Sequence, residues 1–332
     1  MNKMKTGKVK FWFALSVFFL CLVILTSLCL GSVDISVSKI ISILLGENGG
    51  TDGIIIRHLR LPRIIASIIA GVSLALAGCG LQSIFRNPLA EPSITGVSSG
   101  ASLGAVVAIM FFSSTLALEV LAFVFALLAS LTVCKIGSEG GKVNPSSTIL
   151  AGVAINALCG ACVGLFMYTT RDTGLKSFVF WALGSFDKCD WQSINICLLI
   201  SLPAWLIMLS QYKNLNAMLL GERQAFNIGV NVKRTQILVV LSAVAMTASC
   251  VAMCGTIGFV GLIIPHIARL ICGAGNGKVM PLSIIMGASL MVSADLFARY
   301  LSPENPIPIG VLTAILGAPF FVFILRRNKG NA

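Results

Sequence analysis

The residues that could do chemistry in this 332-residue chain are few and lie far apart. The two histidines, His58 and His266, stand without the carboxylate or cysteine neighbours that metal ligation and acid–base catalysis need. The nucleotide-binding motif GxxxxGK[ST] does not occur. We therefore predict that the chain is not an enzyme and binds no cofactor or metal of its own.

One carboxylate, Asp295, lies well inside a long apolar segment, and Arg299 follows it by one helical turn. This spacing places both side chains on one helix face, so we predict a structural ion pair. A proton relay would usually need several such ionisable groups. The eleven cysteines lie mostly in apolar runs, and even the sequence Cys159-Gly-Ala-Cys162 has no histidine or carboxylate nearby. We interpret them as small packing residues.

The elements that must position these residues are membrane-spanning helices. The chain is 57% hydrophobic and 11% charged, whereas a soluble domain carries about 25% charged residues. A spanning helix needs roughly 20 mostly apolar residues. We predict an all-α integral membrane protein, a single transmembrane domain over residues 1–332, with the first apolar run too long for a cleaved signal peptide. Ten spans are expected, at 11–31, 64–85, 95–112, 115–135, 147–170, 192–210, 235–255, 258–272, 280–301 and 308–326.

The distribution of basic residues sets the orientation. With the N-terminus inside, cytoplasmic segments hold sixteen of the 24 Lys and Arg residues, which agrees with the positive-inside rule. Both termini are then cytoplasmic. The rule also explains the net charge of +12, so nucleic acid is not expected as a partner.

Two loops are long enough to form structure. The outer loop 32–63 contains an apolar stretch from Val33 to Leu45, which predicts a short amphipathic helix in the membrane interface. The inner loop 211–234 keeps helical spacing of its apolar residues, with a break at Gly221 and an end at Gly229. We expect two short helices outside the bilayer there, which offer a handle for a cytoplasmic partner.

Small residues recur at every fourth position in two spans, which places each set on one helix face. For the first set we expect ordinary packing. The second includes an amide within the bilayer, so pore lining and packing both stay open. The sets are Gly96, Gly100, Gly104 and Ala108, and then Gly152, Asn156, Gly160 and Gly164.

Arginines gather on the predicted outer side, against the inside bias. Arg57, Arg60 and Arg63 precede the second span, and Arg299 ends the ninth. They could anchor helix ends, and docking of acidic groups from a partner is at least as well supported.

A series of motifs follows in order from about residue 55 to the C-terminus. The motifs are Arg60-Leu-Pro-Arg63, Gln82 through Arg86-Asn-Pro-Leu-Ala-Glu-Pro92 to Ala101, Leu150-Ala-Gly-Val153, Leu220-Gly-Glu222, Gly258-Phe-Val-Gly-Leu262, Pro265-His266 with Arg269, and Gly310 through Gly317-Ala-Pro-Phe320. With this series the chain resembles the FecCD-type permease family, the BtuC-like membrane subunits of ABC importers for iron-siderophores, haem and cobalamin.

The resemblance implies a type II ABC importer permease in the bacterial plasma membrane. Its implied partners are a second permease copy or paralogue, expected as a homodimer, two cytoplasmic ATPases that hold ATP and Mg²⁺, and an extracytoplasmic binding protein. The cargo would be an iron chelate (siderophore or haem) or cobalamin.

The resemblance also implies residue roles. Arg60, Arg63 and Arg299 would dock the binding protein. Coupling to the ATPase would fall to Leu220, Gly221, Glu222, Ala225 and Gly229. The translocation path and inner gate would include Asn87, Leu89, Ser146, Ser147, Gly152, Asn156 and Gly160. The chain departs from the family in having Pro306 two residues before Pro308, where Glu is common, with Glu304 two residues earlier.

Two other classes of function were weighed. A secondary transporter driven by an ion gradient predicts paired intramembrane carboxylates and broken helices, and Asp295 alone offers anything of that kind. A membrane-embedded enzyme predicts clustered His, Asp or Glu, and two isolated histidines argue against it.

Overall fold

The computed structural model describes residues 2–31, 33–112, 114–139, 142–302 and 306–329. Within them most residues are helical, with loops between the helices and a short hairpin of β1 (Ser138–Glu139) and β2 (Lys142–Val143). The helices are α1 (Asn2–Cys29), α2 (Val37–Leu44), α3 (Gly50–Ile54), the π-helix η1 (Ile55–Arg60), α4 (Leu61–Phe85), the 3-10 helix η2 (Pro92–Thr95), α5 (Val97–Phe111), α6 (Thr115–Ile136), α7 (Pro145–Thr169), α8 (Asp172–Ala182), α9 (Trp191–Ser210), α10 (Tyr212–Met218), α11 (Glu222–Asn227), α12 (Val232–Cys254), α13 (Val260–Cys272), α14 (Asn276–Leu301) and α15 (Ile309–Lys329).

The described residues contain seven helical segments long and apolar enough to cross a membrane, together with three shorter apolar helices. Each coincides with one of the ten spans predicted from hydropathy, so that prediction is confirmed. The shorter three are α5, α13 and α15, of which α13 has 13 residues. The second span is longer than expected, because α3, η1 and α4 form one helical segment of 36 residues from Gly50 to Phe85.

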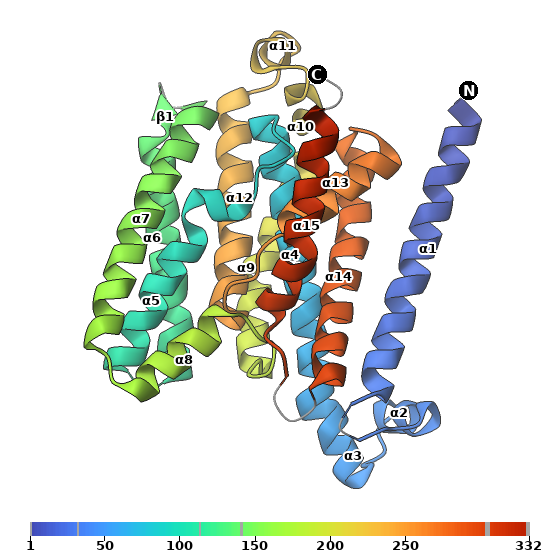
Figure 1. The fold of residues 1–332 in the computed structure, drawn as a ribbon. Coiled ribbons are helices and arrows are strands. Elements are labelled where there is room, and N and C mark those ends of the chain that lie inside the picture. Colours follow the sequence, from blue (N-terminus) through green and yellow to red (C-terminus); the bar gives the residue numbers. More distant parts are fainter. Residues whose placement is uncertain (1, 32, 113, 140–141, 303–305, 330–332) are drawn as a thin grey trace.

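Helix α4 forms the centre of the bundle and packs against α9, α12, α13 and α14 (Figure 1). Glycine makes two of these contacts possible. A Cβ atom on Gly78 would lie 1.8 Å from the Gly261 carbonyl oxygen of α13, and one on Gly71 would lie 2.2 Å from that of Gly287 in α14. Backbones therefore touch directly at both crossings. The same holds for Gly100 and Gly104 against α6, which confirms the packing role predicted for that set.

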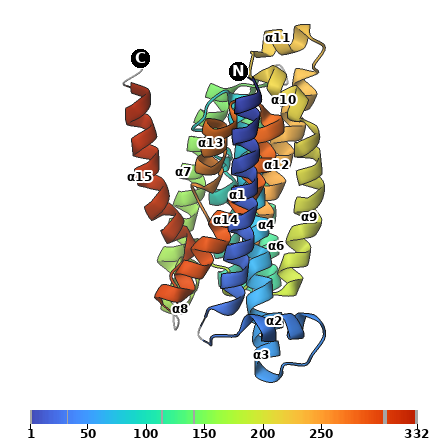
Figure 2. The ribbon, with the colours of Figure 1, turned by 90° about the vertical axis from the view of Figure 1, so that its right-hand side faces the viewer.

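The two predicted loop structures stand at opposite ends of the bundle. Helices α10 and α11 project from one end, where α1 also begins and α15 ends, whereas α2 and α3 cover the other end (Figures 1 and 2). We call these the α11 end and the α3 end. The pair of short helices expected in 211–234 is confirmed, and α2 confirms the helix expected within Val33–Leu45.

Candidate functional site

At the α3 end, Asp295 joins two arginines from different helices. Its Oδ2 accepts a hydrogen bond of 3.0 Å from Arg299 Nε, and its Oδ1 accepts one of 2.6 Å from Arg63 Nε. The Asp295 side chain is 1% exposed. The predicted pair with Arg299 is confirmed, and the contact with Arg63 adds a bond between α14 and α4. A carboxylate held by two guanidiniums suits a structural network rather than a proton relay.

Arg63 has a second acidic partner at the surface. Its Nη1 donates to Asp187 Oδ1 over 2.7 Å, and the Asp187 side chain is 57% exposed while that of Arg63 is 9% exposed. The third nitrogen, Nη2, is buried and donates to no group in the described part of the chain. One buried and one exposed carboxylate thus balance the charges of Arg63 and Arg299.

Arg60 fastens the end of α1 to the start of α4. Its guanidinium donates to the carbonyl oxygens of Leu28, Cys29 and Val33. These include carbonyls that the helix end itself leaves unpaired, which explains why Arg60 is buried. Arg299 is tied to α1 as well, because its Nη2 donates to Ser27 Oγ over 2.5 Å. The three arginines expected to display their charge at the outer surface are therefore turned inward, and docking by them stays a prediction.

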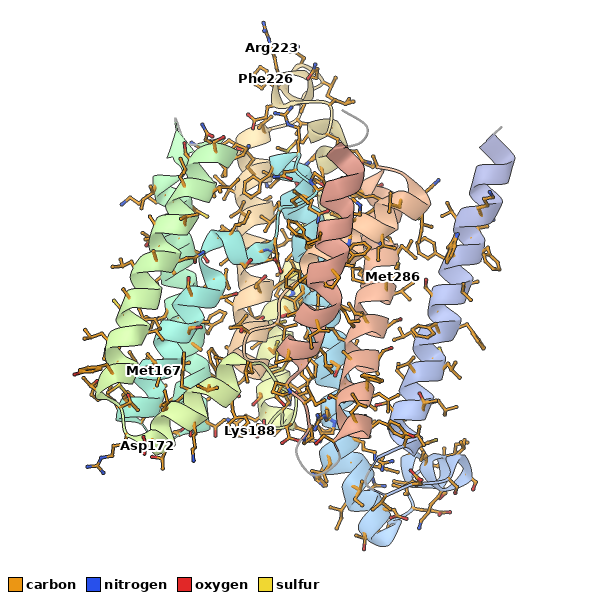
Figure 3. The ribbon with its side chains drawn as sticks, viewed as in Figure 1. Met167, Asp172, Lys188, Arg223, Phe226 and Met286 are labelled. Carbon is orange, nitrogen blue, oxygen red and sulfur yellow. The ribbon has the colours of Figure 1, made fainter. Side chains whose placement is uncertain are left out.

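The α11 end carries an exposed apolar tip. Figure 3 shows Arg223 and Phe226 at its extremity, and Phe226, Leu220 and Ile228 are all largely exposed, Phe226 by 70%. Glycines shape the tip. Gly221 and Gly229, with φ of 117° and 90°, allow the chain to turn before and after α11. Ala225 is the buried residue that seats α11 on the bundle.

The side chain of Gln236 on α12 connects this tip to the chain just before α7. Its Nε2 donates to Glu222 Oε1 over 2.9 Å, while its Oε1 accepts from Val143 N over 3.1 Å. Two residues after Val143, α7 begins, and its first turn is capped by Asn144 Oδ1, which accepts from Ser146 N at 3.0 Å and Ser147 N at 3.4 Å. The predicted coupling and gate residues are thus linked through one buried amide.

The predicted gate turn at Asn87 and Leu89 is an irregular segment, as its two prolines require. Asn87 Oδ1 accepts from Leu89 N over 2.9 Å and closes an Asx turn. Arg86 precedes it in the left-handed conformation with φ 47°. Its Nη1 lies 3.6 Å from the position that a Cβ on Gly221 would take. The turn therefore lies beside the junction of α10 and α11.

Farther along this segment, Glu91 accepts a hydrogen bond of 2.6 Å from Phe259 N at the start of α13. Phe259 has the left-handed φ of 68°, rare for an aromatic residue. Its ring fills the space above Gly317 of α15, where a Cβ would come within 2.4 Å of Phe259 Cγ. The motif residues Glu91, Phe259 and Gly317 thus join the gate segment to α13 and α15.

The small-residue face of α7 divides into two parts. Gly152 packs against η2, where a Cβ would lie 2.0 Å from the Ile94 carbonyl oxygen, and Asn156 Oδ1 accepts from Ser99 Oγ over 2.5 Å. Gly160 and Gly164 face open space within this chain. Packing therefore applies to the first half of α7, whereas the second half has a face that no described residue covers. Pore lining by this helix stays a prediction.

No group of three or more His, Cys, Asp or Glu lies together in the described ranges. His58 is exposed, and the ring of His266 lies 6.3 Å from that of Phe320 in an edge-on arrangement. Pro306 precedes α15, and Glu304, the other residue of the departure from the family pattern, lies outside the described residues.

Sequence reasoning missed Gln236, Asp187 and the bond between Glu91 and Phe259. Glu91 and Phe259 stand in the quoted motifs, so those motifs carried a signal that was not used. Gln236 had a weaker one, as a polar residue near the start of a span. Asp187 lies in a loop with other charged residues, and nothing in its sequence context distinguishes it.

Comparison with known proteins agrees with this architecture. The chain is 34% identical over 315 residues to the hemin transport system permease protein HmuU of Yersinia pestis, covering 93% of this chain and 94% of that protein. It is 38% identical over 283 residues to the cobalamin import system permease protein BtuC of Halobacterium salinarum, covering 85% and 76%. A solved structure of a metal-chelate type ABC transporter in an inward-facing conformation matches with 33% identity and a TM-score of 0.83, covering 96% of this chain and 99% of that one.

The bundle is thus the type II ABC importer permease fold. The model of the FecCD transport family matches residues 19–327, nearly the whole length. This multi-pass membrane chain belongs to the FecCD transport family.

Proposed function

We propose that this chain is the permease subunit of an ABC importer that moves an iron chelate, haem or cobalamin into the cell. An extracytoplasmic binding protein delivers the cargo, and separate cytoplasmic ATPases, which hold ATP and Mg²⁺, supply the energy. The α11 end then faces the cytoplasm and the α3 end faces outward, as the distribution of basic residues predicts. The family match over nearly the full length is the principal support.

The observation that carries the energy-coupling part is the projecting apolar tip. Leu220, Phe226 and Ile228 are exposed beyond the bundle in a segment too polar to be a span. Exposed apolar side chains gathered at one point mark a protein contact. A cleft in an ATPase subunit is the occupant we propose.

Movement of the tip has two routes into the membrane domain. One passes from Glu222 through Gln236 to Val143, immediately before α7. The other passes from Gly221 to Arg86 and the Asn87 turn beside it. We propose that closure of the ATPases shifts both routes together and switches the cavity between outward and inward openings.

The uncovered faces of α7 and α15 supply the path in this proposal. Residues exposed on α7 include Gly160 and Gly164, and those on α15 include Ile315 and Leu316. A second permease copy or paralogue, with the homodimer as the simpler case, would face them across the cargo. A wall of small and apolar side chains offers few strong contacts, so cargo would pass without being held.

The test is reconstitution of the chain in liposomes with its partner ATPase and binding protein. Haem, a ferric siderophore and cobalamin serve as three separate probes. We expect uptake of one probe that needs ATP and the binding protein and proceeds without an ion gradient. Uptake driven by a proton or sodium gradient in the absence of the ATPase would instead identify a secondary transporter.

A further inference from the structure

The ion pair between Arg63 and Asp187 differs from the others in its network. Asp295 is buried and bound by two arginines, whereas Asp187 is more than half exposed and accepts from Arg63 alone. Exposed ion pairs are weak, because water competes for both charges. Of the two carboxylates in this network, Asp187 is therefore the one whose separation from its arginine costs less free energy.

Asp187 also satisfies only part of the hydrogen-bonding capacity of the Arg63 guanidinium. Only Nη1 donates to that carboxylate, and Nη2 beside it has no acceptor among the described residues. A carboxylate approaching the guanidinium end could accept from both nitrogens, and such bidentate pairs are stronger than single bonds. Once Asp187 has left, an external carboxylate that accepts from both nitrogens would bind Arg63 more strongly than Asp187 does through Nη1 alone.

Asp187 belongs to the 183–190 segment, which joins α8 to α9 at the α3 end. Its neighbour Lys188 lies on that side of the bundle, short of the extremity that α3 forms (Figure 3). The segment is anchored at its far side, where Asp190 caps α9 by accepting from Ser193 N over 2.8 Å. This hydrogen bond lowers the pKa of Asp190, so the cap is retained at neutral pH.

The near side of the segment holds the start of α15. Ile309 N donates to Gly184 O over 2.8 Å, and Gly310 N donates to Leu183 O over 3.0 Å. Gly310 fits because a Cβ there would lie 2.3 Å from the Leu183 carbonyl oxygen. Ser185 N also donates to Cys254 O at the end of α12. Asp187 is thus a side-chain link between α4 and a segment bonded to α15.

We propose that Asp187 is an internal competitor for the docking site on Arg63. A carboxylate of the binding protein replaces Asp187 on Arg63 and thereby cuts the side-chain link from α4 to the 183–190 segment, which is bonded to the start of α15. Docking at the outer face is thereby signalled to a helix of the proposed path. The inference rests on the proposed function, because it requires an acidic partner at this face.

The experiment compares Asp187→Asn with wild type and with Asp172→Asn in the assembled transporter in nanodiscs. Asp172 is exposed at the same end and lies at the start of α8, away from the 183–190 segment (Figure 3). Its substitution by Asn removes an equal charge without changing the contacts of Arg63. We expect the partner binding protein to bind Asp187→Asn about 2- to 5-fold more tightly than wild type. Asp172→Asn should bind like wild type, and Asp187→Glu, which restores a competing carboxylate, should return affinity toward wild type.

Hydrogen exchange without the binding protein tests release of the segment. The amides of Ile309 and Gly310 should exchange faster in Asp187→Asn than in either comparison protein. Equal or weaker binding of Asp187→Asn, or unchanged exchange, overturns the inference while wild-type binding leaves the proposed function standing. A lower melting temperature with unchanged affinity means that Asp187 has a structural role alone. Absence of binding to wild type refutes the proposed function and the inference with it.

Discussion

Gln236 and Glu222 are joined by a hydrogen bond of 2.9 Å. The donor is the side-chain amide nitrogen of Gln236 on the spanning helix α12, and the acceptor is the carboxylate of Glu222, the first residue of the projecting α11. The oxygen of the same side-chain amide accepts a hydrogen bond from the backbone nitrogen of Val143, and Gln236 is 1% exposed. A single buried side chain thus connects the part of the chain that meets water to the start of α7. A buried polar group with both ends satisfied ties its partners together rigidly, because breaking either hydrogen bond leaves a buried group unpaired.

Replacement of Gln236 should uncouple ATP hydrolysis from transport. Gln236→Leu leaves the Val143 amide without its acceptor and should destabilise the protein by about 1–3 kcal/mol. We expect ATPase activity of the assembled transporter to persist while uptake falls at least tenfold. Gln192→Leu, an exposed change on α9, is the matched control. Equal losses of hydrolysis and uptake would argue against a relay.

The exposed tip should provide binding energy for the ATPase without stabilising the fold. Phe226→Ala removes a large exposed aromatic side chain, and such anchors typically contribute enough to weaken binding roughly tenfold when truncated. Copurification of the ATPase should fall accordingly, with the melting temperature of the isolated chain unchanged. Tyr168→Ala, also fully displayed but outside the tip, should leave ATPase capture intact. Undiminished capture by Phe226→Ala would place the contact elsewhere.

The protein should be sensitive to loss of the carboxylate that the buried network at the α3 end shares. Asp295→Asn leaves Arg299 without a carboxylate partner and Arg63 with Asp187 alone, and loss of one partner from a buried ion pair costs about 3–5 kcal/mol. Thermal unfolding in detergent should show a large decrease in melting temperature. Asp172→Asn, an exposed carboxylate, should show little change. A small effect at Asp295 would mean that water reaches both arginines.

Glycines on α7 should respond in opposite ways to added bulk. Gly152→Ala forces a methyl group against the Ile94 carbonyl and should destabilise the protein by about 1–3 kcal/mol. Gly160→Phe has open space around it in the single chain. It should fold normally and block uptake if α7 lines the path. Normal uptake by Gly160→Phe would remove this half of α7 from the path.

The spans could be predicted from the sequence because a helix that crosses the hydrocarbon core needs a long apolar run, and such a run can be recognised from its own residues alone. The loop helices were equally local, since Gly221 and Gly229 mark where α11 begins and ends. The pair of Asp295 with Arg299 followed from helical spacing. All of these need information from a few neighbouring residues.

The remaining features depend on contacts between distant segments. Arg63 meets Asp295 across 232 residues of sequence, and no local pattern reveals such a partner. For the same reason the inward orientation of Arg60 was not foreseen, because its acceptors are carbonyls of α1. Gln236 illustrates the same limit. A side-chain amide near the start of a helix is common, and the role of this one depends on its hydrogen bonds to Val143 and Glu222, which are distant in sequence.

The hydrogen bonds from Arg60 to the carboxyl-terminal end of α1 fix that helix to the bundle at one end. Val23 and Leu28 near these hydrogen bonds are buried, whereas Phe11 and Phe18 are exposed, and the amino-terminal half of α1 diverges from α14 (Figure 1). An affinity tag or fluorophore fused ahead of α1 would therefore lie at the α11 end, far from the Arg60 contacts and from the ion-pair network at the α3 end.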